Sequence, residues 1–239
     1  MSKTDQWTSA LSLLNDPRLT EVLVPLHVSA SRDERRLVTR LVPYLPRMLL
    51  RRRLNWEKVS PKLEDLYLAV DPANGLLCYQ LLRALRARRV VELGTSMGIS
   101  AIYLAAAVRD NGGGTVITTE VVPEKAARAR ENLGRSGLLD LVDLRVGDAM
   151  ETLVDVTGPI DFVLNDIHPP VALPIMKRLA PQLRPGAVTL CGNAAVFPAD
   201  YEEYLRWVRD PSNGFSSLQL PMRFAGEFSV KAGPVAESA

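Results

Sequence analysis

The chain has 239 residues, of which 47% are hydrophobic and 23% are charged, and its formal net charge is +2. This length and composition are typical of one soluble α/β domain, and the near-neutral charge favours neither a nucleic-acid nor a membrane partner. Apolar runs are too short to span a bilayer and the first residues lack a signal-peptide core, so we expect a cytoplasmic protein that contacts no membrane.

Residues 1–70 are predicted to form a helical extension that precedes the main domain. Apolar residues recur there at helical spacing, for example at Trp7, Leu11 and Leu14. The motif Ser31–Glu34 resembles a capping box, in which a hydroxyl and an acid bind the free N–H groups of a new helix. Up to residue 87 the pattern predicts helices over residues 7–14, 20–28, 61–70 and 74–85, and one more that starts at Ser31.

A basic stretch over residues 31–58, which includes Arg51–Arg53, allows two interpretations. It could bind nucleic acid, or it could be the solvated face of a helix. Aromatic side chains that would stack on bases are sparse in this stretch. We therefore favour a solvated face and expect no nucleic-acid partner.

Residues 88–232 alternate between strand patterns and helix patterns. Strands are predicted near residues 90–93, 115–120, 141–146, 160–165 and 187–191, followed by a hairpin over 215–220 and 227–232. Helices are predicted after the first strand and over residues 123–135, 150–154, 171–183 and 201–208. This alternation predicts a doubly wound α/β fold with a mostly parallel, seven-stranded sheet, which binds ligands at the carboxyl ends of its strands.

The segment Glu92–Ser100 reads as the end of a buried strand, a glycine turn and the first turn of a helix. Gly94 permits the tight turn, Gly98 permits a close approach, and the N–H groups of the helix start point at a ligand. A dinucleotide fingerprint would instead space its glycines as G-x-G-x-x-G. Glu92 would repel a pyrophosphate, so the loop suits a ligand with positive charge and hydroxyl donors.

Acidic residues follow four predicted strands at the expected binding edge. They are Glu92, Glu120, Asp148 and Asp166. Each acid alone could cap a helix or carry a solvated charge. Four acids at successive strand ends indicate a ligand that offers several hydrogen-bond donors or positive centres.

The segment Glu92–Ser100 is similar to motif I of class I S-adenosylmethionine-dependent methyltransferases, in the form found in the catechol and caffeoyl-CoA O-methyltransferases. The resemblance covers roughly residues 71–232. It implies a Rossmann-like methyltransferase domain over residues 71–239 that binds S-adenosylmethionine. It also implies that the extension, residues 1–70, forms a lid or a homodimer surface.

The resemblance implies a role for each strand-end residue. Glu120 would hold the ribose hydroxyls, Glu92 would lie beside the amino-acid end of the cofactor, and Asp148 would edge the adenine. Hydroxyl and N–H donors of the glycine loop would meet the cofactor carboxylate. The residues expected at the cofactor are Glu92, Gly94, Ser96, Gly98, Ser100, Glu120, Asp148, Ala149 and Asp166.

Two positions depart from the metal-dependent members of this branch. Those members have a lysine three residues after the position of Asp166, where this chain has Pro169. They end the fifth strand with Asp-Asn, where this chain has Gly192 and Asn193. Asp166 and Asn193 alone would make a poor magnesium site. The metal ligands therefore stay unknown, and we expect methyl transfer without a divalent metal.

The proton of an acceptor hydroxyl needs a base if no metal is present. His168 and Asp166 are the predicted catalytic residues, although His168 could equally be a loop residue that only packs or forms hydrogen bonds. We expect a small, partly apolar acceptor, either a phenol or a carboxylate. Its pocket would be roofed by the N-terminal helices and by Phe197, Tyr201, Met222 and Phe224.

Two other functions stay open at the level of sequence. The protein could bind the cofactor without transferring a methyl group, because the lysine and one acid of its relatives are missing. It could also methylate RNA, a function favoured only by the basic stretch Arg47–Arg53.

Overall fold

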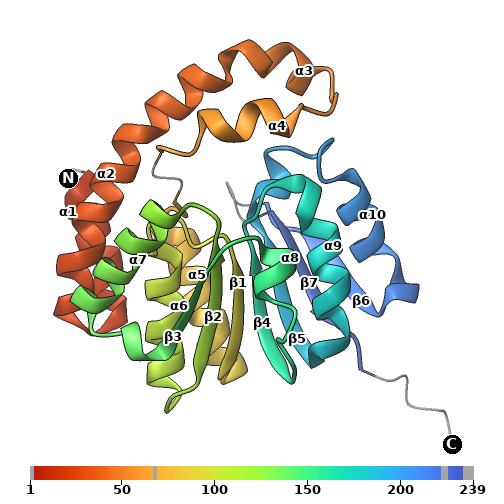
Figure 1. The fold of residues 1–239 in the computed structure, drawn as a ribbon. Helices are drawn as coiled ribbons and strands as arrows, with labels where there is room; N and C mark the ends of the chain where they lie inside the picture. The colour runs from red at the N-terminus through yellow and green to blue at the C-terminus, as the bar shows by residue number, and fades with distance from the viewer. Residues whose placement is uncertain (1–2, 67–68, 222–225, 234–239) are drawn as a thin grey trace, which may run out of the picture.

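The computed structural model describes residues 3–66, 69–221 and 226–233. Within these residues the chain forms a seven-stranded sheet in the order β3-β2-β1-β4-β5-β7-β6 (Figure 1). The first five strands pair in parallel, while β7 runs antiparallel to both β5 and β6. The strands are β1 (Arg89–Leu93), β2 (Thr115–Glu120), β3 (Val142–Val146), β4 (Ile160–Asn165), β5 (Leu183–Cys191), β6 (Phe215–Gln219) and β7 (Glu227–Lys231). The predicted fold class and terminal hairpin are confirmed.

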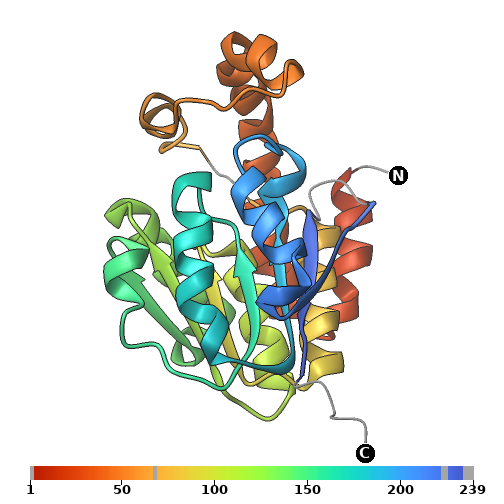
Figure 2. The same cartoon turned by 90° about the vertical axis from the view of Figure 1, so that its right-hand side faces the viewer.

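Helices cover both faces of the sheet (Figures 1 and 2). One face carries α5 (Pro72–Leu85), α6 (Ile99–Asp110) and α7 (Pro123–Ser136). The other carries α8 (Ala149–Thr152), α9 (Pro169–Leu179) and α10 (Glu202–Arg209). Short 3-10 helices lie at Ser12–Leu14, Val42–Tyr44, Ser60–Lys62, Leu139–Leu141, Ala180–Gln182, Gly192–Ala195 and Pro211–Asn213.

The central strands are buried on both faces, as a parallel sheet between two helical layers requires. Val90 and Phe162 pack into the core below α5 and α6, whereas Val91 and Val163 pack into the core below α8 and α9. Neighbouring residues of one strand thus enter opposite cores, because side chains alternate across a strand. The near-continuous apolar runs of the sequence follow from this double burial.

The N-terminal helices are α1 (Lys3–Leu11), α2 (Pro17–Leu41), α3 (Leu45–Leu49) and α4 (Trp56–Val59). The sequence predicted two helices where α2 is one continuous helix, and this prediction was wrong. Ser31, the expected cap, lies inside α2 and its hydroxyl donates back to the Val28 carbonyl at 2.8 Å. The same residue types serve at a cap and inside a helix, so the capping-box pattern alone did not mark a boundary.

The helix predicted over residues 61–70 does not form in the described part of that stretch. Ser60–Lys62 is a 3-10 helix, and turns follow it to Leu66. Residues 67 and 68 lie outside the described residues. Two charged residues in the stretch bind other segments: Asp65 pairs with Arg36 and Arg40, and Lys62 donates to the Tyr44 hydroxyl.

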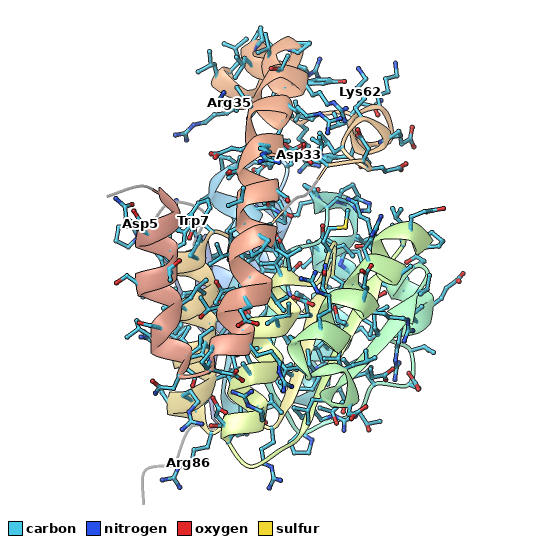
Figure 3. The ribbon with its side chains drawn as sticks, turned by 90° about the vertical axis from the view of Figure 1, so that its left-hand side faces the viewer. Asp5, Trp7, Asp33, Arg35, Lys62 and Arg86 are labelled. Carbon is cyan, nitrogen blue, oxygen red and sulfur yellow. The ribbon has the colours of Figure 1, made fainter. Side chains whose placement is uncertain are left out.

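Helix α2 has two different environments along its length. Its first half packs beside α1 against the main domain (Figure 3). Leu19, Leu23 and Leu26 share a core with Ile102 of α6. Its second half rises beyond the sheet and leads into α3 and α4, which overhang the carboxyl edge of the strands (Figure 1). The division at residue 70 stays a prediction. None of the described helices combines the length and apolar character that a membrane-spanning helix requires.

Candidate active site

The glycine loop after β1 sits at the centre of the carboxyl edge of the sheet. Gly94 has φ +95°, and a Cβ atom there would stand 2.9 Å from the carbonyl oxygen of Asp166. Gly98 has φ +82°, and its close neighbour is Ala129 of α7. Gly98 is therefore needed for packing of the loop against α7, while Gly94 brings the loop against the end of β4.

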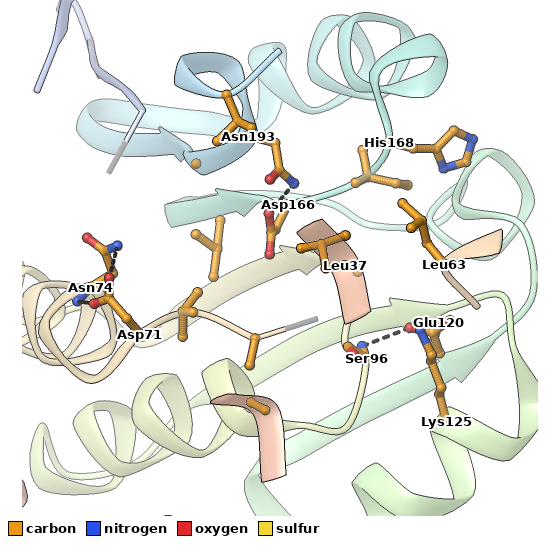
Figure 4. A pocket seen from close by; sticks show the side chains of 18 of the residues that line it. Leu37, Leu63, Asp71, Asn74, Ser96, Glu120, Lys125, Asp166, His168 and Asn193 are labelled. Carbon is orange, nitrogen blue, oxygen red and sulfur yellow. Dashed lines mark hydrogen bonds between the residues drawn. The ribbon is translucent and has the colours of Figure 1, made fainter. Parts of the chain in front are cut away.

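Glu120, at the end of β2, binds the glycine loop directly. Its carboxylate accepts hydrogen bonds from the backbone N–H of Ser96 at 2.7 Å and of Val122 at 2.9 Å. The side chain is 8% exposed and lines a cavity. Lys125, from the first turn of α7, lies beside it (Figure 4), and burial lowers the pKa of this lysine. Sequence reasoning did not identify Lys125.

Glu92 is fully buried and lies behind the cavity wall, since it is absent from the described residues that line the cavity. One carboxylate oxygen accepts from the Thr118 hydroxyl at 2.6 Å, and the other has no partner among the described residues. Burial raises the pKa of Glu92 to about 7, although hydroxyl donors oppose the rise. Ser100, like Gly98, also lies outside the lining.

Asp148 and Ala149 lie where β3 leads into α8, and both line the cavity. The Asp148 carboxylate accepts from the backbone N–H of Met150 at 2.7 Å and thereby caps α8. This hydrogen bond leaves other acceptor positions of the Asp148 carboxylate unoccupied, because an ionised carboxylate has about four. Asp148 is exposed to the cavity and stays available to a ligand.

Asp166 and His168 follow β4 and both line the cavity. The amide nitrogen of Asn193 donates to Asp166 at 2.5 Å, and burial raises the pKa of Asp166 to about 7. His168 is the residue immediately before α9, and its imidazole points away from Asp166 in Figure 4. Burial lowers the pKa of His168. The structure brings Asp166 and Asn193 together and leaves His168 apart from them.

A magnesium ion of the kind that the family resemblance implies does not fit these residues. Asn193 presents its amide N–H to Asp166, and Gly192 offers no side-chain ligand. The described residues contain no group of three or more His, Cys, Asp or Glu side chains placed to hold a metal ion. We derive no step through a metal, and metal independence of the reaction stays a prediction.

The cavity at this edge has a volume of about 710 Å³. Its floor comes from the strand ends, and its roof comes from α2, α4 and the residues around Leu63 (Figure 4). Phe197 and Tyr201 line it as expected, and the Tyr201 hydroxyl donates to the Ile167 carbonyl. Met222 and Phe224, the other expected lining residues, lie outside the described residues.

Acidic side chains dominate the charge of the cavity. Lys125 is the one Lys or Arg among the described residues that line it. Burial lowers the pKa of His27, another lining residue, to about 4, so its ring is neutral. The acidic lining residues are Asp33, Glu34, Glu64, Asp71, Glu120, Asp148 and Asp166.

Comparisons with known proteins agree with this arrangement. A family model for a methyltransferase domain matches residues 91–194. A catechol O-methyltransferase of Niastella koreensis is 32% identical over 130 residues, and one of Mycobacterium tuberculosis is 36% identical over 127 residues. Each match covers 53% of this chain, and they cover 58% and 57% of those relatives, so the chain spans less than two thirds of their length.

A solved structure extends the likeness to the fold. The crystal structure of an O-methyltransferase from Bacillus cereus in complex with SAH superposes with a TM-score of 0.58 and 25% identity, over 68% of this chain and 82% of that one. The sequence match, the strand-end residues and the fold thus point the same way. Residues 91–194 match a methyltransferase domain, and the chain is similar to catechol O-methyltransferases in part of its sequence and to an SAH-bound O-methyltransferase in its fold.

Proposed function

We propose that the protein transfers a methyl group from S-adenosylmethionine to an oxygen of a small, partly apolar phenol or carboxylate, without a divalent metal. One observation carries the proposal: a roofed cavity of about 710 Å³ at the carboxyl edge of the sheet, lined by Ser96, Glu120, Asp148 and Asp166. A cavity of this size suits a cofactor together with a small acceptor.

The cofactor would lie along the strand ends in an order that the sheet dictates. Glu120 would accept the ribose hydroxyls beside the two N–H bonds that it already holds. Asp148 and Ala149, one strand further out, would edge the adenine, and the loop at Gly94 and Ser96 would face the amino-acid end. Glu92, Gly98 and Ser100 would act mainly by shaping this loop, since none of them lines the cavity.

Catalysis would depend on orientation and on removal of one proton. Methyl transfer is an in-line displacement at the sulfonium methyl carbon, and most of the acceleration can come from holding the acceptor oxygen against that carbon. The acceptor hydroxyl would lose its proton to His168, and Asp166, held by Asn193, would line the path of the oxygen. The lowered pKa of His168 keeps its ring neutral and able to accept a proton at neutral pH.

Assembly as a cytoplasmic homodimer is the second part of the proposal. The overhanging end of α2 and α3 exposes large apolar side chains: Val38 is 60% exposed, Leu49 is 81% exposed and Leu50 is 66% exposed. Neighbouring exposed apolar residues of this kind mark interaction surfaces. Sedimentation velocity should show a dimer, and Leu49→Glu together with Leu50→Glu should shift it to monomer; a wild-type monomer at micromolar concentration would contradict this part.

The alternative of RNA methylation is weakened because Arg53, at the end of the basic stretch Arg47–Arg53, is held in ion pairs. Arg36 and Arg40 bind Asp65, and Arg53 binds Glu203 at 2.9 Å. Arg36 and Arg40 tie roof segments to each other, and Arg53 ties the roof to α10, so these three arginines are less available to phosphates. Nucleic-acid binding would be strongly salt-dependent, so a mobility-shift assay at low and moderate salt tests the alternative.

The central experiment has two independent readouts. Calorimetry with S-adenosylhomocysteine tests the cofactor site, and a screen of phenols and carboxylates for release of S-adenosylhomocysteine tests transfer. The proposal predicts binding and turnover with at least one acceptor. Absence of S-adenosylhomocysteine binding would overturn it, whereas binding without turnover across a broad panel would favour a non-methylating protein.

A further inference from the structure

His27 lies on α2 at the far end of the cavity from Glu120 and is almost completely buried, with 3% of its surface exposed. Its Nε2 atom is 2.8 Å from the hydroxyl of Tyr103, a fully buried residue of α6. The Trp7 ring lies 5.8 Å from the His27 ring, centroid to centroid, and also lines the cavity. The Trp7 ring and the His27 imidazole therefore meet at this end of the cavity, while Tyr103 lies outside its lining.

A buried histidine in a helix often does no more than satisfy its own polar atoms within the core. Here the described residues provide a partner for Nε2 only, and no hydrogen bond to Nδ1 is formed by them. His27 thus lies between Tyr103 of α6 and the cavity, which it helps to line. A neutral imidazole with one nitrogen fixed by Tyr103 presents its other nitrogen to a ligand in a defined direction.

Asp71 supplies the charge at the same end of the cavity. It caps α5 by accepting from the backbone N–H of Asn74 at 2.9 Å, and its carboxylate contributes to the raised pKa of Tyr103. Gly75, one turn further along α5, touches the Tyr103 ring, since a Cβ there would stand 2.5 Å from its Cε2 atom. Asp71, Tyr103 and His27 are thus held together by α2, α5 and α6.

The charge balance of the cavity selects among acceptors. Acids outnumber Lys and Arg residues among the described lining residues, and the one lysine lies at the opposite end, beside Glu120. Bringing an anionic acceptor next to Asp71 would cost free energy, because like charges close together repel one another. An ammonium group would gain from Asp71 and from the face of Trp7.

We propose that Trp7, His27 and Asp71 form an acceptor subsite that takes a flat aromatic molecule bearing an amino group and rejects anionic acceptors. This inference rests on the proposed function, and it narrows the acceptor from phenol or carboxylate to a neutral or cationic phenol. Trp7 packs on the ring, Nδ1 of His27 binds a polar group on it, and Asp71 receives the amine. Tyr103 is a positioning residue that acts through His27.

Three para-substituted phenols of matched size test the subsite. Tyramine carries an ammonium group, tyrosol a neutral hydroxyl and para-hydroxyphenylacetate a carboxylate. Each is titrated by calorimetry into protein saturated with S-adenosylhomocysteine. Tyramine should bind at least about tenfold more tightly than para-hydroxyphenylacetate, with tyrosol between them. Equal affinities, tighter binding of the acid, or no binding of any of the three at millimolar concentration would overturn the proposal.

Variants assign the selectivity to named residues. Asp71→Asn retains a good helix cap and should reduce the preference for tyramine over the acid several-fold. Asp210→Asn is the control, because Asp210 also caps a helix, the 3-10 helix Pro211–Asn213, by accepting from the Ser212 N–H, and lies outside the cavity lining. An unchanged preference in Asp71→Asn would contradict the role of Asp71.

The His27 and Tyr103 pair has its own control. Tyr103→Phe removes the hydroxyl that fixes Nε2 and should weaken binding of all three phenols several-fold, with the preference for the amine retained. Tyr79→Phe on α5 removes a hydroxyl bound to Asp110 outside the cavity lining and should change nothing. The affinity for S-adenosylhomocysteine should be unchanged in every variant. If the wild-type protein did not bind S-adenosylhomocysteine, the proposed function itself would be wrong.

Discussion

Gly94 and Asp166 are in backbone contact, so the loop after β1 and the end of β4 meet where the methyl donor is expected. A Cβ atom on Gly94 would stand 2.9 Å from the carbonyl oxygen of Asp166, and the backbone of Gly94 has φ +95°. Contacts below 3.0 Å do not occur for real Cβ atoms, so one of the two segments would have to move. The geometry of the cavity floor thus depends on the absence of a side chain at this position.

Gly94→Ala should lower the free energy of unfolding more than Gly112→Ala does. The positive φ costs about 1–2 kcal/mol with a side chain, and the clash adds a further ~1–3 kcal/mol. Gly112→Ala is the matched control, since Gly112 has φ +89° and nothing lies within 4 Å of an added Cβ. Urea denaturation of both variants checks this; equal losses of unfolding free energy would show that the contact with Asp166 is unimportant.

Glu120→Ala should weaken binding of S-adenosylmethionine by about 1.5–3 kcal/mol, because it removes charge-assisted hydrogen bonds to the ribose. It also removes the bonds that hold Ser96 and Val122. Calorimetric titration measures the affinity. Glu124→Ala, an exposed acid in the first turn of α7, is the control and should leave the affinity as it is. Unchanged affinity in Glu120→Ala would refute the ribose assignment.

The buried Glu92 should make the unliganded protein less stable as pH rises. Its folded-state pKa is raised from 4.5 to about 7, so the folded protein holds the proton more tightly than the unfolded chain does. The stability from this group is fully present below the unfolded pKa and is lost as pH rises through about 7. Chemical denaturation from pH about 4 to about 8, with Glu92→Gln as comparison, should show the wild type losing stability relative to the variant.

A wild type that gains stability relative to Glu92→Gln as pH rises would contradict this prediction. It would mean that the folded protein stabilises the charged form of Glu92. Glu124→Gln should run parallel to the wild type over the same pH range, because Glu124 is exposed. The comparison with a variant is needed because other groups act in the opposite direction. The lowered pKa of His27, about 4, adds stability as pH rises towards the unfolded histidine value.

Methyl transfer should continue at an unchanged rate when divalent metal ions are removed by a chelator. Gly192 offers no side-chain ligand, and the Asn193 amide is bonded to Asp166, so a residual magnesium site would depend on water or substrate oxygens. Turnover should be unchanged after EDTA treatment and after addition of magnesium. Complete loss with EDTA that magnesium restores would contradict the prediction.

His168→Ala should lower turnover about a hundredfold or more if His168 is the base. Burial lowers the pKa of His168, so the wild-type rate should rise with pH below about 6.5 and level off by neutral pH. The variant should lose this rise while it binds S-adenosylhomocysteine normally. A fully active variant would remove His168 from the mechanism and leave metal independence standing.

Much of the sheet could be predicted from the sequence because its signals are local. Apolar runs such as that around Val90 and Val91 mark strands buried on both faces, and the acids at their ends mark the binding edge. A local signal of the same kind gave a wrong helix start at Ser31, because the Ser31 hydroxyl lies inside α2 and donates to the Val28 carbonyl. Local patterns do not record whether the chain continues as a helix.

The roof and far end of the cavity could not be predicted, because they depend on contacts between distant segments. His27 is 76 positions from Tyr103 in the chain, and nothing near it in the sequence indicates that pairing. Lys125 likewise looks like an ordinary helix residue until α7 packs beside β2. Glu92 was correctly placed at a strand end, but only the packed structure shows that it lies behind the wall.

Leu26 and His27 are consecutive residues of α2, one in the core and the other at the cavity. A substitution at His27 therefore acts on the cavity and on the packing of α2 at once. Substitutions that reshape this end of the site also disturb the packing of α2 on α6, and each new preference must be accompanied by repair of the fold. Divergence among proteins built this way should leave paired changes in α2 and α6, and a chain that changed acceptor should carry both.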